Sequence, residues 1–378
     1  MGSRLMQRAL LIVASATATA SGQGFIPPPN GAVPMRWNEG TSFPLPENAT
    51  SRLTQPFRST SDPDWKVVRL MAELSFLAYD NSFPSVANRL RLFDLSLGSF
   101  TTVDHHHAIS GWDPKTRVLV IAFRGTDISQ LADVWTDLDY ETKETQVGNV
   151  HRGFYLATNA LLGGIHYEIK RRKPLHVWIT GHSLGGAMAT ICLAELDRLN
   201  VPVSGVVTFG QPRVGDKEFT EQLNQRLGSR ILRVINERDI VASLPPYIPW
   251  RVPRYYSGGS VIQFLGGELV RSSGVQMMAR PDINEHGEIV QGYTVKPDGE
   301  DDAPRGPAGE VPPDPEQLTE EEYREFQAIL DDDGRLEVTQ HGAPVGGILD
   351  RFNLKERAGQ HSMHLYIQNV ERFAAEGK

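Results

Sequence analysis

The feature that most constrains the fold is a glycine-rich motif at residues 181–185, Gly-His-Ser-Leu-Gly. A short apolar run with β-branched residues, residues 177–180, precedes this motif and is typical of a buried strand. Residues 187–199 follow it, contain no proline and repeat their apolar side chains at helical spacing. The order of strand, turn and helix therefore places Ser183 at a sharp strand-to-helix connection.

The glycines around Ser183 have a physical explanation. A serine on such a sharp turn has a strained backbone, and side chains at the flanking positions would collide with it. Gly181 and Gly185 let the helix begin close to the strand, and we expect the hydroxyl to be exposed at the helix N-terminus, where the dipole favours negative charge. A Gly-x-Ser-x-Gly motif can also be an ordinary tight turn, but between a strand and a helix it is typical of the nucleophile elbow of an α/β-hydrolase. Ser183 is therefore interpreted as a nucleophile.

Composition excludes several classes of protein. The chain has 378 residues and 40% hydrophobic residues, which is ample for a core. Its formal net charge of −8 argues against nucleic acid as a partner, and no apolar run is long enough for a transmembrane helix. Its single cysteine, Cys192, excludes an internal disulfide and is interpreted as a small buried residue rather than a reactive thiol.

The N-terminal residues indicate targeting. Residues 1–20 combine two arginines, an apolar stretch and small residues, which fits a secretory signal peptide. An organelle transit peptide is the alternative, because the first acidic residue is Glu39. Asn48 begins a glycosylation sequon. We expect a secreted protein in which residues 21–64, rich in Pro and Gly, form a linker or a surface strap.

Strands and helices are predicted to alternate along the chain. The pattern predicts helices at residues 66–79, 154–171 and 217–227, and strands at 99–109, 117–123, 203–209 and 231–235. Such alternation favours a mostly parallel central sheet with helices on both faces. The predicted fold class is therefore α/β, specifically an α/β-hydrolase.

The pattern weakens after residue 253. Residues 255–265 are predicted to form one more strand or a hairpin, whereas residues 298–315 are acidic and rich in Pro and Gly. We expect the hydrolase domain to span residues 65–378. Within it, residues from about 266 to 347 are expected to form an acidic, partly disordered insertion.

A serine nucleophile needs a base and a carboxylate that orients the base. In α/β-hydrolases the acid and then the histidine follow the serine along the chain. Asp239 comes just after the predicted strand 231–235, at the sheet edge where sites are built, so it is the preferred acid. Asp216 and Glu237 are interpreted as surface or loop-tying carboxylates.

The base must lie downstream of Asp239. Two histidines there come just before a predicted C-terminal helix, and either could serve as the base. His361 is preferred, and His364 remains the alternative. His182, next to the nucleophile, is interpreted as a packing or hydrogen-bonding residue rather than as a second base.

Several motifs together resemble one family. They include residues 72–79, 123–126 (Phe-Arg-Gly-Thr), 135–138, 150–154, 181–186, 208–213 (Thr-Phe-Gly-Gln-Pro-Arg), 234–239, 244–246 and His361 before Tyr366. This combination resembles the class 3 (fungal-type) lipase family of α/β-hydrolases, which includes triacylglycerol lipases and plant phospholipase A1-type enzymes. The resemblance implies Ser183 as nucleophile, Asp239 as acid and His361 as base.

The resemblance also implies an oxyanion hole. It assigns this role to Thr126, through its backbone N–H and hydroxyl, and to the backbone N–H of Leu184. Thr126 follows a predicted central strand that should lie near the elbow, where a second donor is required.

The family pattern further places a lid between Thr126 and Trp135. The sizeable apolar residues of that segment are Ile128, Leu131 and Val134. Such a small apolar face does not favour strong interfacial activation.

The predicted function is hydrolysis of carboxylic esters of lipids, in the manner of a triacylglycerol lipase, through an acyl-enzyme. A phospholipase A1 or galactolipase and a soluble-ester (feruloyl-type) esterase are the alternatives. A non-catalytic binding protein is less favoured because no triad member is missing. The expected partner is a lipid or ester substrate at a lipid–water interface, and the oligomeric state stays open.

No cofactor and no metal are expected. The histidines at residues 105–107 would alternate between the two faces of a strand, which does not suit a shared metal ion. The acidic residues 331–333 are followed too soon by glycine, and lack the closing glutamate, for a calcium loop.

Overall fold

The computed structural model describes a subset of the chain. The described residues are 49–57, 60, 62–126, 141–237, 239–245, 254–273, 282–283, 289–290 and 361–376. Contacts divide the chain into two compact units, Met1–Phe43 and Pro44–Lys378, and every described residue belongs to the second unit.

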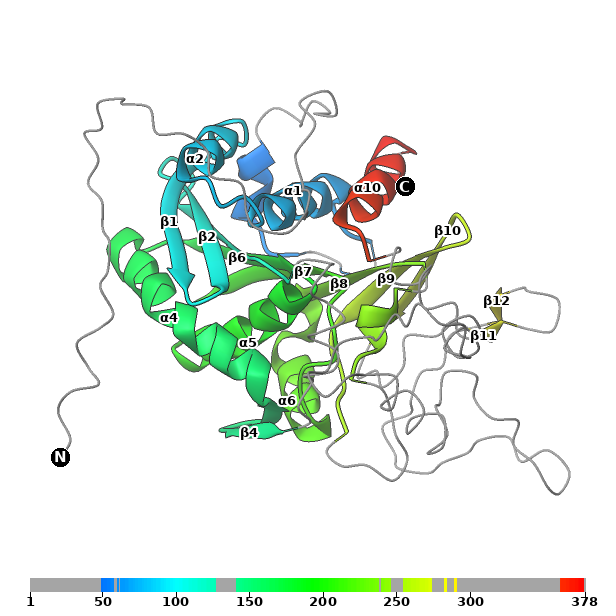
Figure 1. Cartoon of the computed structure of the whole chain (residues 1–378). Helices are drawn as coiled ribbons and strands as arrows, with labels where there is room; N and C mark the ends of the chain where they lie inside the picture. The colour runs from blue at the N-terminus through cyan, green and yellow to red at the C-terminus, as the bar shows by residue number, and fades with distance from the viewer. Residues whose placement is uncertain are drawn as a thin grey trace, which may run out of the picture. The chain divides into compact units, whose positions relative to one another are not determined.

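An eight-stranded sheet forms the framework of the second unit, in the order β1-β2-β3-β6-β7-β8-β9-β10. Its strands are β1 (Ser96–Val103), β2 (His106–Asp113), β3 (Val118–Phe123), β6 (His176–His182), β7 (Val203–Phe209), β8 (Ile231–Asn236), β9 (Ser260–Leu265) and β10 (Glu268–Ser273). Neighbours from β3 to β9 pair in parallel, whereas the pairs β1–β2, β2–β3 and β9–β10 are antiparallel. The predicted mostly parallel sheet is confirmed (Figure 1).

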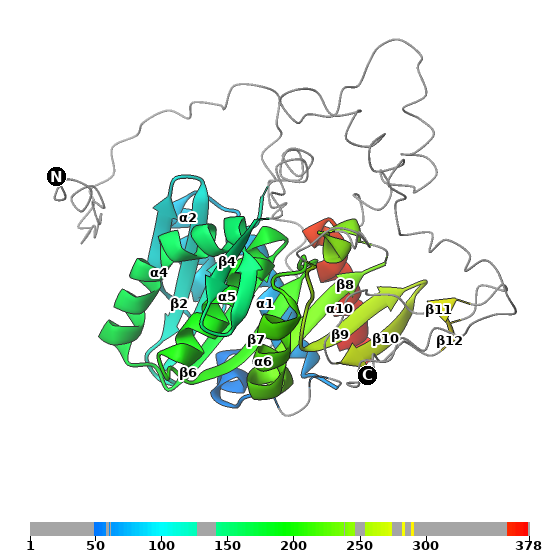
Figure 2. The same cartoon turned by 90° about the horizontal axis from the view of Figure 1, so that it is seen from below.

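Helices cover both faces of this sheet (Figures 1 and 2). One face carries α1 (Trp65–Leu77) and α10 (Met363–Glu376), and the other carries α4 (Arg152–Arg172), α5 (Leu184–Arg198) and α6 (Lys217–Leu227). The predicted α/β architecture with two helical layers is therefore confirmed. None of the described helices combines the length and apolar character needed to cross a membrane.

Helices α1, α2 and α6 start at polar side chains that accept hydrogen bonds from their first turns. Asp64 accepts from the backbone N–H of Lys66 at the start of α1, and Asp216 accepts from that of Phe219 at the start of α6. Helix α2 (Phe83–Arg91), which was not predicted, starts at Ser82 with a proline in its first turn.

The remaining elements are short. They are the antiparallel pairs β4 (Thr142–Thr145) with β5 (Gly148–His151) and β11 (Asp282–Ile283) with β12 (Ile289–Val290), and the 3-10 helices η2 (Ala49–Thr54), η4 (Gly228–Arg230) and η5 (Ile240–Ser243).

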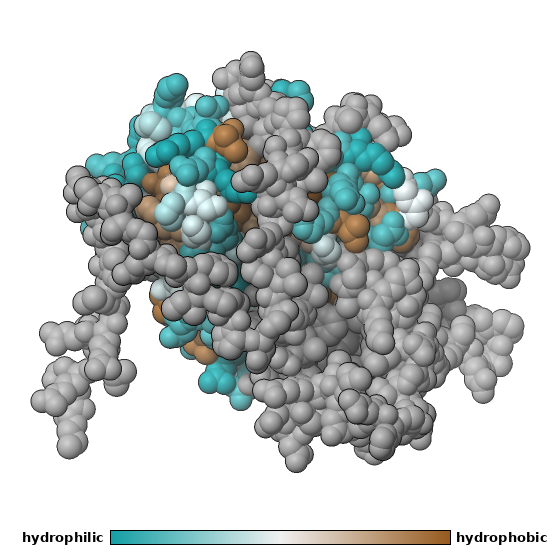
Figure 3. All heavy atoms as spheres, turned by 45° about the horizontal axis from the view of Figure 1, so that its top comes forward, coloured by the Kyte–Doolittle hydropathy of each residue, from teal (hydrophilic) through white to brown (hydrophobic). Residues whose placement is uncertain are grey.

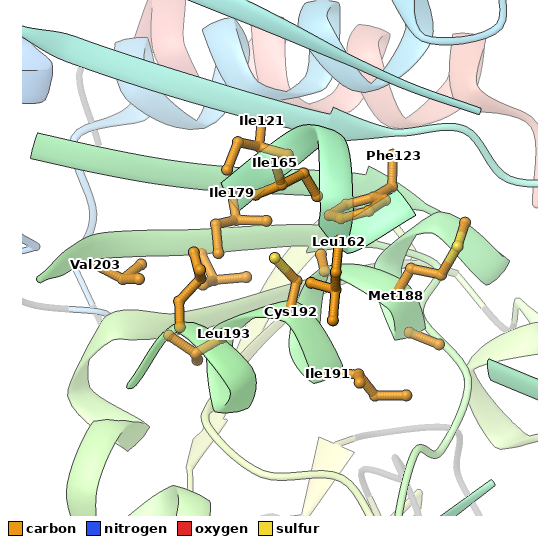
Figure 4. Close-up of a cluster of buried hydrophobic side chains, with 14 of the residues drawn as sticks. Ile121, Phe123, Leu162, Ile165, Ile179, Met188, Ile191, Cys192, Leu193 and Val203 are labelled. Carbon is orange, nitrogen blue, oxygen red and sulfur yellow. The ribbon is translucent and has the colours of Figure 1, made fainter. Parts of the chain in front are cut away.

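The main core lies between the sheet and helices α4 and α5. Figure 4 shows Ile121 and Ile179 from the strands facing Leu162 and Met188 from these helices. Cys192 belongs to this cluster and is fully buried, so its interpretation as a buried small residue is confirmed. Burial raises the pKa of its thiol, which keeps it in the unreactive protonated form.

The prediction of one strand over residues 99–109 is wrong. Strands β1 and β2 form a hairpin there, and the chain turns at Asp104 and His105. Asp104 has a positive φ of 54°, a conformation that aspartate tolerates in turns. His107 is buried in β2, and its Nδ1 lies 2.8 Å from Thr102 Oγ1.

The start of the predicted insertion overlaps a strand. Residues 268–273 form β10, which pairs with β9 across a two-residue turn. Gly266 and Gly267 both have positive φ, as this hairpin turn requires. The first part of the predicted insertion is therefore an edge strand of the central sheet.

Part of the predicted linker or strap packs on the sheet. Leu53 in η2 is fully buried, and its carbonyl accepts a hydrogen bond of 2.8 Å from the Trp178 indole. The ring of Phe57 meets the ring of Trp178 edge-on at 4.9 Å. These contacts favour a strap over a free linker for residues 49–57.

Candidate active site

Ser183 lies at the turn between β6 and α5. Its backbone has φ 58° and ψ −132°, a strained conformation for a residue with a side chain. A Cβ on Gly181 would lie 2.2 Å from the Gly185 carbonyl oxygen, and a Cβ on Gly185 would lie 2.3 Å from the Phe123 carbonyl oxygen. The backbone approach that was predicted to require glycine on both sides of Ser183 is confirmed.

The predicted exposure of the Ser183 hydroxyl is wrong, because Ser183 is only 1% exposed. Neighbouring strand ends close around it. Its backbone N–H donates to the Phe209 carbonyl at 2.9 Å, and a Cβ on Gly125 would lie 3.0 Å from Ser183 Cβ. The loop after β3 and the end of β7 therefore pack against the elbow.

Asp239 and His361 meet at the same edge of the sheet. Asp239 follows β8, His361 precedes α10, and Asp239 Oδ2 lies 2.7 Å from His361 Nδ1. Asp239 is 2% exposed and His361 is fully buried. A carboxylate can only accept a hydrogen bond, so this contact places the imidazole proton on Nδ1 and leaves Nε2 able to take up a proton.

Gly210, in the loop after β7, holds this pair close to the strand ends. It has a φ of 56°, and a Cβ there would lie 2.6 Å from Asp239 Oδ2 and 2.7 Å from the His361 ring. Only glycine fits at this position. Phe209, the last residue of β7, accepts the hydrogen bond from the Ser183 backbone, and the next residue, Gly210, lies against Asp239 and His361.

Oδ2 of Asp239 has a second hydrogen-bond donor besides His361. The Tyr366 hydroxyl donates to Asp239 Oδ2 at 2.5 Å, from the first turns of α10. Burial, with the Asp239 charge and this hydrogen bond, raises the pKa of Tyr366 well above its usual range, so it stays a donor. Its spacing of five residues from His361 was visible in the sequence, but its partner was not.

His361 Nε2 is buried and has no hydrogen-bond partner among the described residues. The His361 ring stacks on that of His182, the neighbour of Ser183, with centroids 4.3 Å apart. The structure therefore brings the nucleophile candidate and the base candidate to one place. The arrangement offers a hydroxyl, an imidazole with an available nitrogen and a buried carboxylate.

The two predicted oxyanion donors flank Ser183. Leu184 is the first residue of α5, and the first N–H groups of a helix have no partners within it. Thr126 follows Gly125, which packs against the elbow. Both N–H groups therefore stay candidates for the oxyanion hole.

The alternative candidates for the acid and the base make other contacts. Asp216 begins α6 and accepts hydrogen bonds from Phe219 and Asn149, which makes it a loop-tying carboxylate. Glu237 accepts from the Gly266 N–H in the β9–β10 turn. His364 is exposed and packs on Phe76.

Several predictions lie outside the described residues, among them the signal peptide at residues 1–20 and the linker or strap up to residue 48. Two more concern the site and its surroundings. These are the lid candidates Ile128, Leu131 and Val134, and most of the acidic insertion at residues 266–347. Within the described ranges, no group of three or more His, Cys, Asp or Glu side chains could hold a metal ion.

A mostly parallel sheet with helices on both faces and a strand–serine–helix elbow at its centre defines an α/β-hydrolase. Residues 120–248 match the family model of class 3 lipases, and this segment includes both Ser183 and Asp239. The resemblance to class 3 lipases found in the sequence is therefore confirmed over these residues.

Curated relatives match over the same part of the chain. A secreted mono- and diacylglycerol lipase from Malassezia globosa is 30% identical over 145 residues, covering 34% of this chain and 47% of the relative. A lipase from Rhizomucor miehei is 34% identical over 140 residues, covering 34% of this chain and 38% of that protein. A chloroplastic phospholipase A(1) from Arabidopsis thaliana is 39% identical over 75 residues, covering 19% of this chain and 17% of that protein. The chain thus spans about half the length of these relatives or less.

Proposed function

We propose that this protein hydrolyses carboxylic esters of lipids through a covalent acyl-enzyme. The observation that carries the proposal is the buried Asp239–His361 pair beside a serine held in a strained elbow. Matching relatives described as lipases support the class of substrate.

In the first half of the reaction, Ser183 Oγ attacks the ester carbonyl carbon while His361 Nε2 takes the hydroxyl proton. Asp239 holds the imidazole in the correct tautomer and stabilises its charged form. The N–H groups of Thr126 and Leu184 hold the oxyanion. The tetrahedral intermediate then loses the alcohol, which receives the proton from His361 Nε2.

Water completes the cycle. His361 Nε2 removes a proton from water, whose oxygen attacks the acyl carbon on Ser183. Collapse of the second tetrahedral intermediate returns the proton to Ser183 Oγ and releases the carboxylic acid. Each half-reaction uses the same donors, since the charge develops at the same oxygen.

The acyl-enzyme is tested with wild-type protein and Ser183→Ala on emulsified triacylglycerol, phospholipid vesicles and a soluble short-chain ester. Wild type should hydrolyse at least one of them, and Ser183→Ala none. Ser204→Ala is a matched control, because it removes a buried hydroxyl at the opposite end of β7. Equal turnover of Ser183→Ala and wild type would refute the proposal.

The same assay separates the substrate classes. Triacylglycerol turnover supports a lipase, the class named for the relative from Rhizomucor miehei. Vesicle turnover supports a phospholipase A1, the class named for the plant relative. Activity on the soluble ester alone identifies an esterase. A mass increase on Ser183 after treatment with an ester-mimicking phosphonate would report the nucleophile independently of substrate.

We also propose that the protein is secreted. The relative from Malassezia globosa is described as secreted, and residues 1–20 have the composition of a signal peptide. Expression of the full chain followed by mass analysis of the N-terminus tests this. Protein retained in the cells with residues 1–20 intact would contradict it.

A further inference from the structure

His182 makes two hydrogen bonds at the end of β6, directly before Ser183. It is 2% exposed, its Nε2 lies 2.8 Å from the backbone carbonyl oxygen of His361, and its Nδ1 lies 2.7 Å from the Tyr79 hydroxyl. Tyr79 follows helix α1 on the other side of the ring. The residue before the nucleophile therefore binds the backbone of the residue proposed as base.

Hydrogen-bond chemistry fixes the proton positions. A carbonyl oxygen only accepts, so His182 Nε2 must carry the proton that it donates to His361. In a neutral imidazole Nδ1 then has no proton, and it accepts the proton of the Tyr79 hydroxyl. Burial, followed by the nearby His361 charge, lowers the pKa of His182 well below its ordinary value, which keeps the ring neutral.

We propose that His182, with Tyr79, is a positioning pair that fixes the His361 backbone relative to Ser183. This inference rests on the proposed ester hydrolysis and assigns the pair no contact with substrate. His182 is the last residue of β6 and Ser183 follows it directly, so the nucleophile and the anchor of its base are joined by one peptide bond. The Tyr79 hydroxyl selects the His182 tautomer that can donate to the carbonyl.

The arrangement suits a base that changes its charge. His361 becomes a cation each time it takes a proton, and the His182 ring is stacked against it at 4.3 Å. A charged neighbour would oppose that step, whereas a neutral one does not. Because both nitrogens of His182 are occupied, it cannot compete as a second base.

The proposal is tested with three variants of the full chain. His182→Leu removes both hydrogen bonds, His182→Gln keeps an N–H donor near the position of Nε2, and Tyr79→Phe removes only the hydroxyl. Misplacing a reacting group by about 1 Å can cost roughly 100-fold in rate. We expect His182→Leu to lower kcat by roughly 10- to 100-fold with KM within about twofold of wild type.

The conservative variants separate positioning from packing. His182→Gln should recover most of the lost kcat, and Tyr79→Phe should lie between wild type and His182→Leu. Wild-type kcat in a folded His182→Leu would overturn the proposal. So would a His182→Gln variant that melts like wild type but is as slow as His182→Leu.

A second measurement does not depend on turnover. The Nδ1 proton of His361, held by Asp239, should give a low-field proton resonance that Asp239→Asn abolishes and thereby assigns. We expect this resonance to be sharp in wild type, shifted in Tyr79→Phe and broadened in His182→Gln less than in His182→Leu. An unchanged resonance in all three variants overturns the positioning role. A wild type with this resonance but without ester hydrolysis refutes the proposed function alone.

Discussion

Asp239 Oδ2 lies 2.7 Å from His361 Nδ1, although 122 residues separate the two in the sequence. Both side chains are buried, so water cannot replace either partner when the other is removed. Two further hydrogen bonds hold the pair. The Tyr366 hydroxyl donates to the Asp239 carboxylate, and His182 binds the backbone carbonyl of His361. The base candidate is therefore fixed by contacts from α10, β6 and the loop after β8.

Changing Asp239 should abolish activity while changing Asp216 should not. Asp239→Asn cannot hold the required tautomer, and a loss of about 10⁴-fold in kcat is expected by analogy with other triads. Asp216→Ala removes the N-cap of α6 and should cost about 1 kcal/mol of stability with turnover retained. Ester hydrolysis and urea unfolding measure the two effects, and an inactive, folded Asp216→Ala would contradict the assignment.

Removing the Tyr366 hydroxyl should weaken both the site and the fold. Tyr366→Phe leaves Asp239 Oδ2 with one donor fewer in a buried environment. Hydrogen bonds to charged groups contribute about 1.5–3 kcal/mol, so a stability loss in that range is expected together with a several-fold lower kcat. Denaturant unfolding and steady-state kinetics check this. Tyr366→Phe with wild-type values of both would show that the hydroxyl is dispensable.

Replacing glycine by alanine should lower the stability of the protein at Gly181 and raise it at Gly163. A Cβ on Gly181 meets the Gly185 carbonyl oxygen at 2.2 Å, so Gly181→Ala must distort the elbow and should cost more than about 2 kcal/mol. A Cβ on Gly163 in α4 meets nothing within 4 Å, and Gly163→Ala should add about 0.5–1 kcal/mol. Thermal unfolding of both variants is the measurement. Equal changes in the two would show that backbone crowding at the elbow is not the cause.

Glu73 should make the fold less stable as the pH rises. It lies on α1, is 6% exposed and faces Arg69, Arg89 and Glu371. Burial raises its pKa from 4.5 to about 7, more than the nearby arginines lower it. The folded state therefore holds the Glu73 proton more tightly than the unfolded state. The stabilisation from this proton is fully present below about pH 4.5, decreases as the pH rises, and is gone above about pH 7.

Glu73→Gln should therefore gain stability over wild type as the pH rises. The difference in unfolding free energy between Glu73→Gln and wild type should increase by on the order of 3 kcal/mol from about pH 4.5 to about pH 8. Urea unfolding at both pH values measures it. Glu218→Gln, an exposed carboxylate of α6, serves as control and should show no such change. A pH-independent difference for Glu73→Gln would contradict the raised pKa.

Local sequence patterns were sufficient to predict those segments whose structure depends mainly on their own residues. The elbow was predictable because Gly181 and Gly185 are needed wherever a helix starts this close to a strand. The prediction of a single strand over residues 99–109 failed because the turn at Asp104 depends on a left-handed residue that the alternation of side chains does not reveal. The β9–β10 turn was visible as Gly266-Gly267, but it was assigned to the insertion.

The sequence by itself determined the α/β class, the nucleophile candidate and the chain order of acid and base candidates, because these depend on short-range spacing and on family motifs. Only the tertiary structure showed that His361 rather than His364 lies against Asp239, since that contact depends on how the segment before α10 packs on the loop after β8. It also decided that Ser183 is buried and that Tyr79, His182 and Tyr366 bind around the site. Contacts between residues more than a hundred positions apart form only when the sheet brings its strand ends together, and no local pattern contains them.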